Sequence, residues 1–207
     1  IVQGLTISAV MMPMGRLGDI IGRRKVYLIG LVVFGIGMAS TALSTVFAIL
    51  IISRVISAIG NSMVQSVATA MTVSVFPENQ RGKALGMQAT LVAAGIATGP
   101  VAAGLLLQFF SWQSIFWMIM IPTGISLVLG YTLLSEQLVS RNVPNKRPAF
   151  DWTGAVVSAL VITIGVVLIN NPFGIGVLSP LMIGGATSVI ALLAIFIWWE
   201  LKSDSPM

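Results

Sequence analysis

Seven runs of apolar residues alternate with short polar connections along the chain. The runs lack the strict alternation of half-buried strands, and several exceed strand length, so the pattern predicts helices. All but the first are long enough to cross a bilayer, which takes about 17–25 residues in a helix. The predicted spans cover about 1–14, 26–45, 46–75, 84–110, 114–134, 153–170 and 178–199.

The composition places these helices in a membrane. The chain has 207 residues, of which 57% are hydrophobic and 8% are charged, whereas soluble domains carry about 25% charged residues. Backbone groups in lipid must be bonded internally, which favours helices, and a barrel would show alternating segments of about 10 residues. We therefore predict an all-α protein, a polytopic helix bundle whose first partner is the lipid bilayer.

The residue types that the sequence lacks exclude several kinds of functional site. The chain contains no cysteine and no histidine, which removes disulfides, thiol chemistry and the commonest metal ligands. No Asp or Glu lies inside a predicted span, so an intramembrane enzyme is disfavoured. We expect no catalytic residue, no metal site and no cofactor. The net charge of +5 is scattered between apolar runs instead of forming one basic face, so no nucleic acid partner is expected.

The charges are distributed unevenly between alternate connections. Every charged residue except Arg54 falls in the connections near 15–25, 76–86 and 135–152 or after 199, and the intervening connections carry none. The positive-inside rule makes the charged side cytoplasmic. We predict an integral, multi-pass protein of the cell (plasma) membrane with its charged loops in the cytoplasm.

Arg54 is the exception, about nine residues into the third span. A cation at the centre of a membrane helix costs about 2.5–3.5 kcal/mol on insertion scales, and such residues usually face a protein interior or a wet cavity. A snorkelling arginine near a helix end is the alternative. It is disfavoured, because the outer end of the span is several residues away.

A polar stripe accompanies Arg54 along the third span. At 100° per residue, Asn61, Gln65 and Thr72 lie within about 20° of its direction and Ser57 within about 60°. We predict that Ser57, Asn61 and Gln65 line a water-accessible cavity. Hydrogen bonding between helices, which is common in bundles, is the alternative.

The fourth span contains the sequence GIATGPVAAG. Gly95 and Gly99 share a face, so a neighbouring backbone could approach closely, and Pro100 removes one helix bond and tends to kink the helix. The region is typical of a bend or pivot, with ordinary small-residue packing as the alternative.

Three of these segments together resemble the major facilitator superfamily. GRLGDIIGRRK resembles its cytoplasmic loop between helices two and three, and Gly15, Asp19, Gly22, Arg23 and Arg24 match that motif. Ile20 stands where the family often has a basic residue. The resemblance implies a gating loop, in which the aspartate faces a neighbouring helix end and pairs with arginine. A basic cluster that only sets topology would not need the glycines and the aspartate at fixed spacing.

The other two motifs resemble features of proton-coupled exporters. LIISRVISAIGNS resembles the helix-four motif around an intramembrane arginine, which implies a proton-coupling role for Arg54, although Ser57 and Ala58 replace the usual Gln and Gly. GIATGPVAAG resembles the antiporter motif of helix five. Its matching residues, Gly95, Gly99, Pro100 and Gly104, would form the pivot.

The resemblance extends over nearly the whole chain and implies a domain organisation. FDWTGA and the last span resemble the branch of 14-span drug:proton antiporters, which has two extra helices between its halves. On this basis residues 1–134 hold helices two to six of the N-terminal half, 135–152 a cytoplasmic loop, and 153–207 two linker helices. The chain would be a piece that begins inside a helix, and its partner would be the missing remainder of the same transporter, including the titrating carboxylate.

The function that this resemblance implies is proton-coupled efflux of amphiphilic, often cationic small molecules by alternating access. The small-molecule substrate and protons would be the transported partners. A symporter for a nutrient or metabolite on the same fold is the first alternative. A membrane sensor or scaffold that moves no solute is the second.

Overall fold

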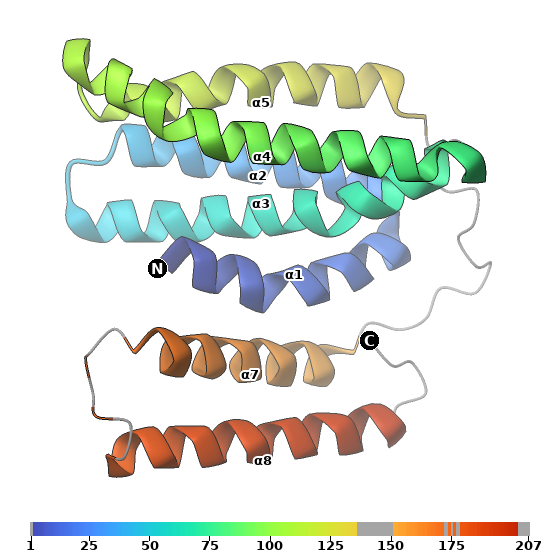
Figure 1. Cartoon of the computed structure of the whole chain (residues 1–207), viewed down its shortest axis with the longest axis vertical. Coiled ribbons are helices and arrows are strands. Elements are labelled where there is room, and N and C mark those ends of the chain that lie inside the picture. The colour runs from blue at the N-terminus through green and yellow to red at the C-terminus, as the bar shows by residue number, and fades with distance from the viewer. Residues whose placement is uncertain (1, 136–150, 172–173, 175, 177–178, 203–207) are drawn as a thin grey trace.

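The computed structural model describes residues 2–135, 151–171, 174, 176 and 179–202. Within these residues every regular element is an α-helix (Figure 1). The helices are α1 (Val2–Ile21), α2 (Arg23–Ala42), α3 (Phe47–Val75), α4 (Glu78–Phe109), α5 (Gln113–Leu133), α7 (Trp152–Asn170) and α8 (Pro180–Lys202).

The predicted all-α membrane bundle is confirmed. Each of the seven predicted apolar runs forms a helix. Six helices of the described part, α2 to α5, α7 and α8, are long and apolar enough to cross a membrane, and α1 is not among these six. The apolar pattern therefore gives the elements correctly.

Two connections predicted as loops are largely helical, which corrects the sequence interpretation. In the segment 15–26 only Gly22 lies outside a helix, because α1 continues through the charged stretch to Ile21. Likewise α4 begins at Glu78, so only Phe76 and Pro77 separate it from α3. Polar residues and glycines end the apolar pattern in both places, but a change in hydropathy does not by itself end a helix, and the backbone continues through them.

The contact between α2 and α3 is made by glycine. A Cβ atom on Gly37 would collide with the backbone nitrogen of Ser57, and one on Gly60 would collide with the backbone nitrogen of Phe34. Gly30 is similarly close, since a Cβ there would lie 2.8 Å from the Cβ of Met63. The two backbones therefore touch directly, as in small-residue packing between membrane helices.

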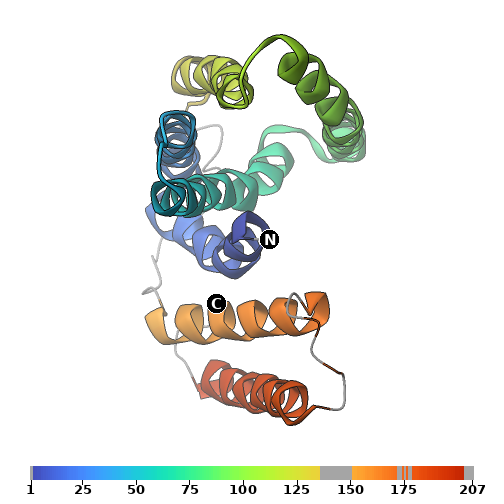
Figure 2. The same cartoon turned by 90° about the vertical axis from the view of Figure 1, so that its left-hand side faces the viewer.

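The other helices of the first bundle are arranged around this pair. α1 packs on α3 and α2, and α5 packs on α2. α4 contacts only α3 and α5 among the described helices, and Ala84 is its one buried residue. Figure 2 shows α4 curving away from α2 and α3. One core cluster joins α2 and α3 through Val26, Met63, Val67 and Met71.

The last two helices form a hairpin whose α7 packs on α1 (Figures 1 and 2). Asp151 caps α7 by accepting a 2.9 Å bond from the backbone N–H of Gly154. Its other oxygen accepts a 3.1 Å bond from the indole N–H of Trp199 on α8. Most of the predicted cytoplasmic loop lies outside the described residues, and the division at 134 and 153 stays a prediction.

Replacing Gly37 with alanine should destabilise the bundle by about 1–3 kcal/mol, the usual cost of overpacking. The matched control is Gly35→Ala on the same helix, where an added Cβ meets nothing within 4 Å. Thermal unfolding in detergent, followed by tryptophan fluorescence, should show a lower midpoint for Gly37→Ala only. Equal midpoints would contradict direct backbone contact between α2 and α3.

Candidate functional site

Gly22 forms the whole break between α1 and α2. Its backbone has φ 106° and ψ 129°, a conformation that glycine adopts freely and other residues adopt only with strain. Its N–H donates a 3.1 Å bond to the carbonyl of Gly18, and its carbonyl accepts a 3.1 Å bond from Val26. One residue thus reverses the chain direction while both flanking helices stay bonded.

Asp19 and Arg23 form an ion pair across this break. The Nη2 and Nε groups of Arg23 donate to Oδ1 of Asp19 at 2.9 and 3.1 Å. The Nη1 group reaches the carbonyl of Ala70 on α3 at 3.5 Å. Partly exposed pairs of this kind contribute about 0–1 kcal/mol. The pair therefore fixes geometry more than it adds stability, and it brings α1, α2 and α3 together at one end.

Arg24 bonds with a different helix. Its Nη2 group donates a 2.8 Å bond to the carbonyl of Tyr131 near the C-terminus of α5, and its guanidinium lies 5.7 Å from the centre of the Tyr131 ring. A cation is favourable where the last carbonyls of a helix lack partners. Two neighbouring arginines of one motif thus tie α2 to α1 and to α5 separately.

The glycines before the ion pair differ in how closely they are packed. A Cβ on Gly15 would meet only the Cβ of Ser66, at an ordinary 3.7 Å. A Cβ on Gly18 would lie 2.5 Å from a methyl group of Val67. The close approach of α1 to α3 therefore requires Gly18, which the sequence interpretation had not singled out as a site residue.

The Arg54 side chain on α3 reaches both α1 and α5. Its Nη1 group donates a 3.0 Å bond to Oε1 of Gln3 on α1. Its guanidinium lies 4.6 Å from the ring centre of Phe116 on α5, within the range of a cation–π contact. Both partners are neutral. Among the described residues no carboxylate pairs with Arg54, so its charge remains uncompensated.

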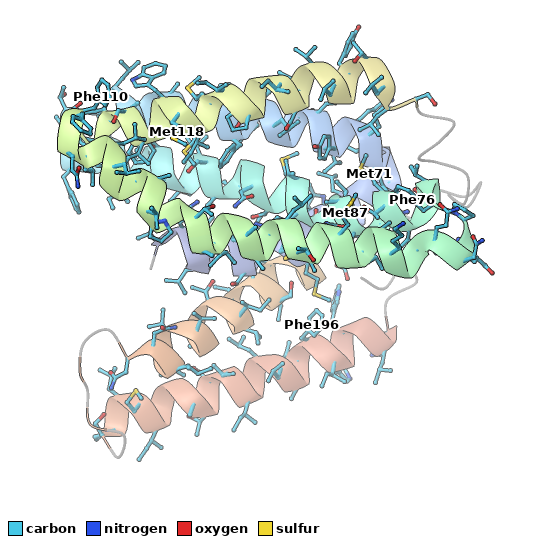
Figure 3. The ribbon with its side chains drawn as sticks, turned by 45° about the horizontal axis from the view of Figure 1, so that its top comes forward. Met71, Phe76, Met87, Phe110, Met118 and Phe196 are labelled. Atoms are coloured by element: carbon cyan, nitrogen blue, oxygen red, sulfur yellow. The ribbon has the colours of Figure 1, made fainter. Side chains whose placement is uncertain are left out.

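The polar stripe on α3 is continuous with a groove beside α4. Gln65 donates a 3.1 Å bond to Asn61, and the hydroxyl of Thr72 lies 3.3 Å from Oε1 of Gln88 on α4. Thr72 and Gln88 line a groove of about 420 Å³, together with Phe76, Ala84, Met87, Leu91 and Val92. Figure 3 shows Phe76 and Met87 at this place between the two helices.

Ser57 is placed apart from the other stripe residues. It is fully buried in the contact with Gly37 of α2, and its hydroxyl donates a 2.9 Å bond to the carbonyl of Arg54. The structure therefore assigns Ser57 to helix packing, 60° around α3 from the line of Asn61 and Gln65. The cavity-lining role of Asn61 and Gln65 stays a prediction.

The glycine motif of α4 has no packing partner among the described helices. A Cβ atom on Gly95, Gly99 or Gly104 would meet nothing within 4 Å, and α4 continues through Pro100 to Phe109. The ribbon bends in this C-terminal part of the helix (Figure 1). Ordinary small-residue packing within the described bundle therefore does not explain these glycines, and their pivot role stays a prediction.

Besides Gly18, four residues of the site were missing from the sequence interpretation: Gln3, Gln88, Phe116 and Tyr131. Gln3 and Gln88 could have been found as polar residues in or near apolar runs. Phe116 and Tyr131 carry no such signal, since aromatic residues are ordinary in membrane helices. Their roles appear only when α5 is placed against α2.

Comparison with known families agrees with this arrangement. The sequence matches the family described as Major Facilitator Superfamily over residues 1–203. The chain belongs to the major facilitator superfamily. Its helices α1 to α5 and its charged break at Gly22 are accordingly those of a transporter family whose members move small molecules across membranes.

The similar curated proteins are transporters and resistance proteins. The riboflavin transporter RibZ of Clostridioides difficile is 34% identical over 81% of this chain and 36% of its own length. The multidrug resistance protein Stp of Mycobacterium tuberculosis is 29% identical over 98% of this chain and 37% of its own length. The methylenomycin A resistance protein of Bacillus subtilis is 29% identical over 98% of this chain and 42% of its own length. The chain thus spans about two fifths or less of these relatives.

Gly22→Ala should strain the break by about 1–3 kcal/mol, the cost of holding a residue with a Cβ in this backbone region. Gly82→Ala on α4 is the control, because a Cβ there meets nothing and the backbone is already helical. Thermal unfolding in the same detergent should show a lower midpoint for Gly22→Ala alone. A midpoint equal to that of the control would mean that the break does not need glycine.

Proposed function

We propose that the transporter to which this chain belongs exports amphiphilic, often cationic compounds in exchange for protons, by alternating access across the plasma membrane with the charged loops in the cytoplasm. The observation that carries the proposal is the environment of Arg54. Gln3 and Phe116 hold its guanidinium in place without neutralising it. A charge kept unpaired inside a membrane helix is costly and is usually functional.

The chemistry available to Arg54 is the control of a carboxylate. A nearby cation lowers the pKa of an acid and holds it deprotonated. A proton or a cationic substrate can then compete with Arg54 for that acid, which couples the two. In this proposal the acid comes from outside the predicted spans of this chain, because they contain no Asp or Glu.

Asp19 and Arg23 serve as the gate in this proposal. Their ion pair holds the cytoplasmic ends of α1 and α2 together, and it is exposed enough to be exchanged for other partners at low cost. Rocking of the two halves of a transporter requires contacts that form and break with similar energies. A pair worth about 1 kcal/mol or less meets that requirement.

The outward direction of transport rests on α4 and on the relatives. Gly95, Gly99, Pro100 and Gly104 form an uncovered small-residue face that resembles the antiporter motif. Two similar proteins are named for resistance to drugs or to methylenomycin A, which is the phenotype of export. A symporter that takes up a small nutrient or metabolite is the second candidate, because a similar protein is a riboflavin transporter.

In the full-length protein, Arg54→Ala should lower proton-driven export at least about tenfold, which corresponds to about 1.4 kcal/mol. Arg54→Lys should also be impaired, because lysine lacks the planar fork that contacts Gln3 and Phe116 together. The control is Lys83→Ala, an exposed basic residue at the start of α4.

The measurement is substrate accumulation in inside-out vesicles after a proton gradient is imposed. Unchanged export by Arg54→Ala, at equal membrane content, would remove Arg54 from the mechanism. Accumulation that needs the opposite gradient would favour the uptake carrier.

Asp19→Asn should reduce transport severalfold while the protein still inserts and unfolds at nearly the same temperature. The reason is that the lost ion pair contributes about 0–1 kcal/mol to stability, whereas its geometry joins three helices. Transport and thermal unfolding are to be measured on the same preparation. Transport equal to that of the unaltered protein would contradict the gating role. The charged stretch would then serve only to set the orientation of the helices in the membrane.

A further inference from the structure

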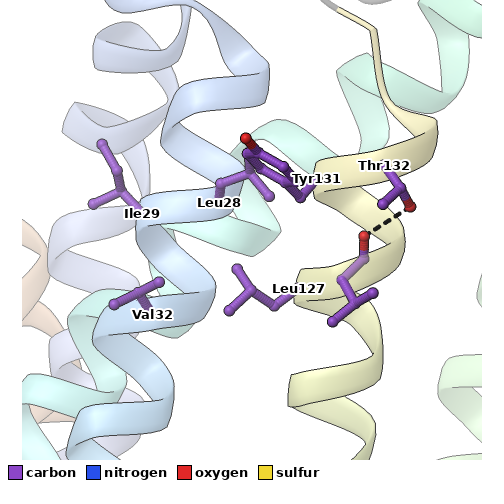
Figure 4. A pocket seen from close by; sticks show the side chains of 7 residues that line it. Leu28, Ile29, Val32, Leu127, Tyr131 and Thr132 are labelled. Atoms are coloured by element: carbon purple, nitrogen blue, oxygen red, sulfur yellow. Dashed lines mark hydrogen bonds between the residues drawn. The ribbon is translucent and has the colours of Figure 1, made fainter.

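An apolar groove runs between α2 and α5 on the surface of the bundle. Its first part has a volume of about 530 Å³ and is lined by Leu28, Ile29, Val32, Leu127, Val128, Tyr131 and Thr132. Figure 4 shows Leu28, Leu127 and Tyr131 in the space between the two helices. The hydroxyl of Thr132 is turned back to the carbonyl of Val128 at 2.8 Å, so the walls present hydrocarbon almost throughout.

The groove continues toward the other end of the helices. A second part of about 300 Å³ shares Val32 and Leu127 with the first and extends as far as Ala39 on α2. From Leu28 to Ala39 the helix rises about 17 Å, at 1.5 Å per residue. That length is close to half of the roughly 30 Å hydrocarbon core of a bilayer. The groove therefore matches the depth of one lipid leaflet.

Two glycines open the second part. Gly35 on α2 and Gly124 on α5 both line it, and a Cβ atom on either would meet nothing within 4 Å. They are unlike Gly37, whose missing Cβ brings two backbones into contact. No atom of the described residues fills the space at Gly35 and Gly124.

The groove faces away from the predicted transport pathway. Gly30 is on the side of α2 that touches α3, and at 100° per residue Val32 and Gly35 point about 160° and 140° away from it. No residue of α1, α3, α4, α7 or α8 lines either part. Within the described residues the groove is therefore open on the outer side of the bundle.

A cation stands at the mouth of the groove. Arg24 is one helical turn before Leu28, bonds with the carbonyl of Tyr131 and lies over the ring of that groove residue. A guanidinium has five N–H donors. One bonds with Tyr131, and the Nε group is buried without a hydrogen-bond partner among the described residues, so the donors left for a headgroup are those of the two Nη groups. Arg23 and Lys25 make this end of α2 basic.

We propose that the groove binds one acyl chain of an anionic phospholipid from the leaflet on the charged side, with the lipid phosphate at Arg24. The apolar walls accept the chain, the length fits one leaflet, and the basic end selects a negative headgroup over a zwitterionic one. Each basic residue near a membrane surface attracts anionic lipid by about 1 kcal/mol, or about fivefold in affinity. The site borders the gating loop through Arg24, but its apolar walls belong to α2 and α5, and it does not depend on what the transporter carries.

The test is native mass spectrometry of the full-length protein, titrated with phosphatidylglycerol or with phosphatidylcholine of the same chains. The unaltered protein should retain one more phosphatidylglycerol than either groove-filling variant, Gly35→Leu or Gly124→Leu. Gly165→Leu is the matched control, since an added Cβ on this α7 glycine also meets nothing. Arg24→Gln should reduce the preference for phosphatidylglycerol about fivefold while phosphatidylcholine still binds.

The two filling variants lie on opposite walls, so failure of one to fold leaves the other as a test. Equal lipid retention by the unaltered protein and by both filling variants would overturn the proposal, because another part of the protein or a second copy would then cover the groove. A preference for phosphatidylglycerol that Arg24→Gln leaves unchanged would overturn the assignment of the headgroup to Arg24.

Discussion

In a bilayer the hydrophobic effect does not hold helices together, since lipid tails are as apolar as the side chains they would replace. Close van der Waals contact must supply the attraction, and in this bundle it is provided where Gly30, Gly37 and Gly60 allow the backbones of α2 and α3 to touch. The orientation of α3 follows from that contact. With its glycine and serine face against α2, its polar stripe is turned toward α1 and α4.

Three arginines of this chain have side-chain partners of different kinds. Arg23 has a carboxylate, Arg24 a helix carbonyl and a ring, and Arg54 an amide and a ring. The first two are at a helix end, where water and headgroups reduce the cost of charge. Arg54 is within the span, and the partners found for its guanidinium among the described residues, Gln3 and Phe116, are both neutral, so it can still attract an additional anion.

The sequence was sufficient for the elements and insufficient for their ends and partners. Lipid imposes long apolar helices, so the spans could be read directly from hydropathy. The end of α1 depends on the φ angle of a single residue, Gly22, and hydropathy does not report on angles. The bond between Gln3 and Arg54 joins residues 51 positions apart, and a periodic pattern within one helix contains no such pairing. Gly15 and Gly18 look alike in the sequence, and only the approach of Val67 separates them.

The single-residue junction at Gly22 also bears on how motion is transmitted. A connection of several residues has slack, and each helix can shift before the other responds. Here the backbones of α1 and α2 remain hydrogen-bonded on both sides of Gly22. The side chains of Asp19 and Arg23, which flank this glycine, are also bonded to each other. A displacement of the end of α1 must therefore be passed to α2 at once. The two helices therefore move as one bent unit that is joined at Gly22. Inserting residues at this position would let α1 and α2 move independently.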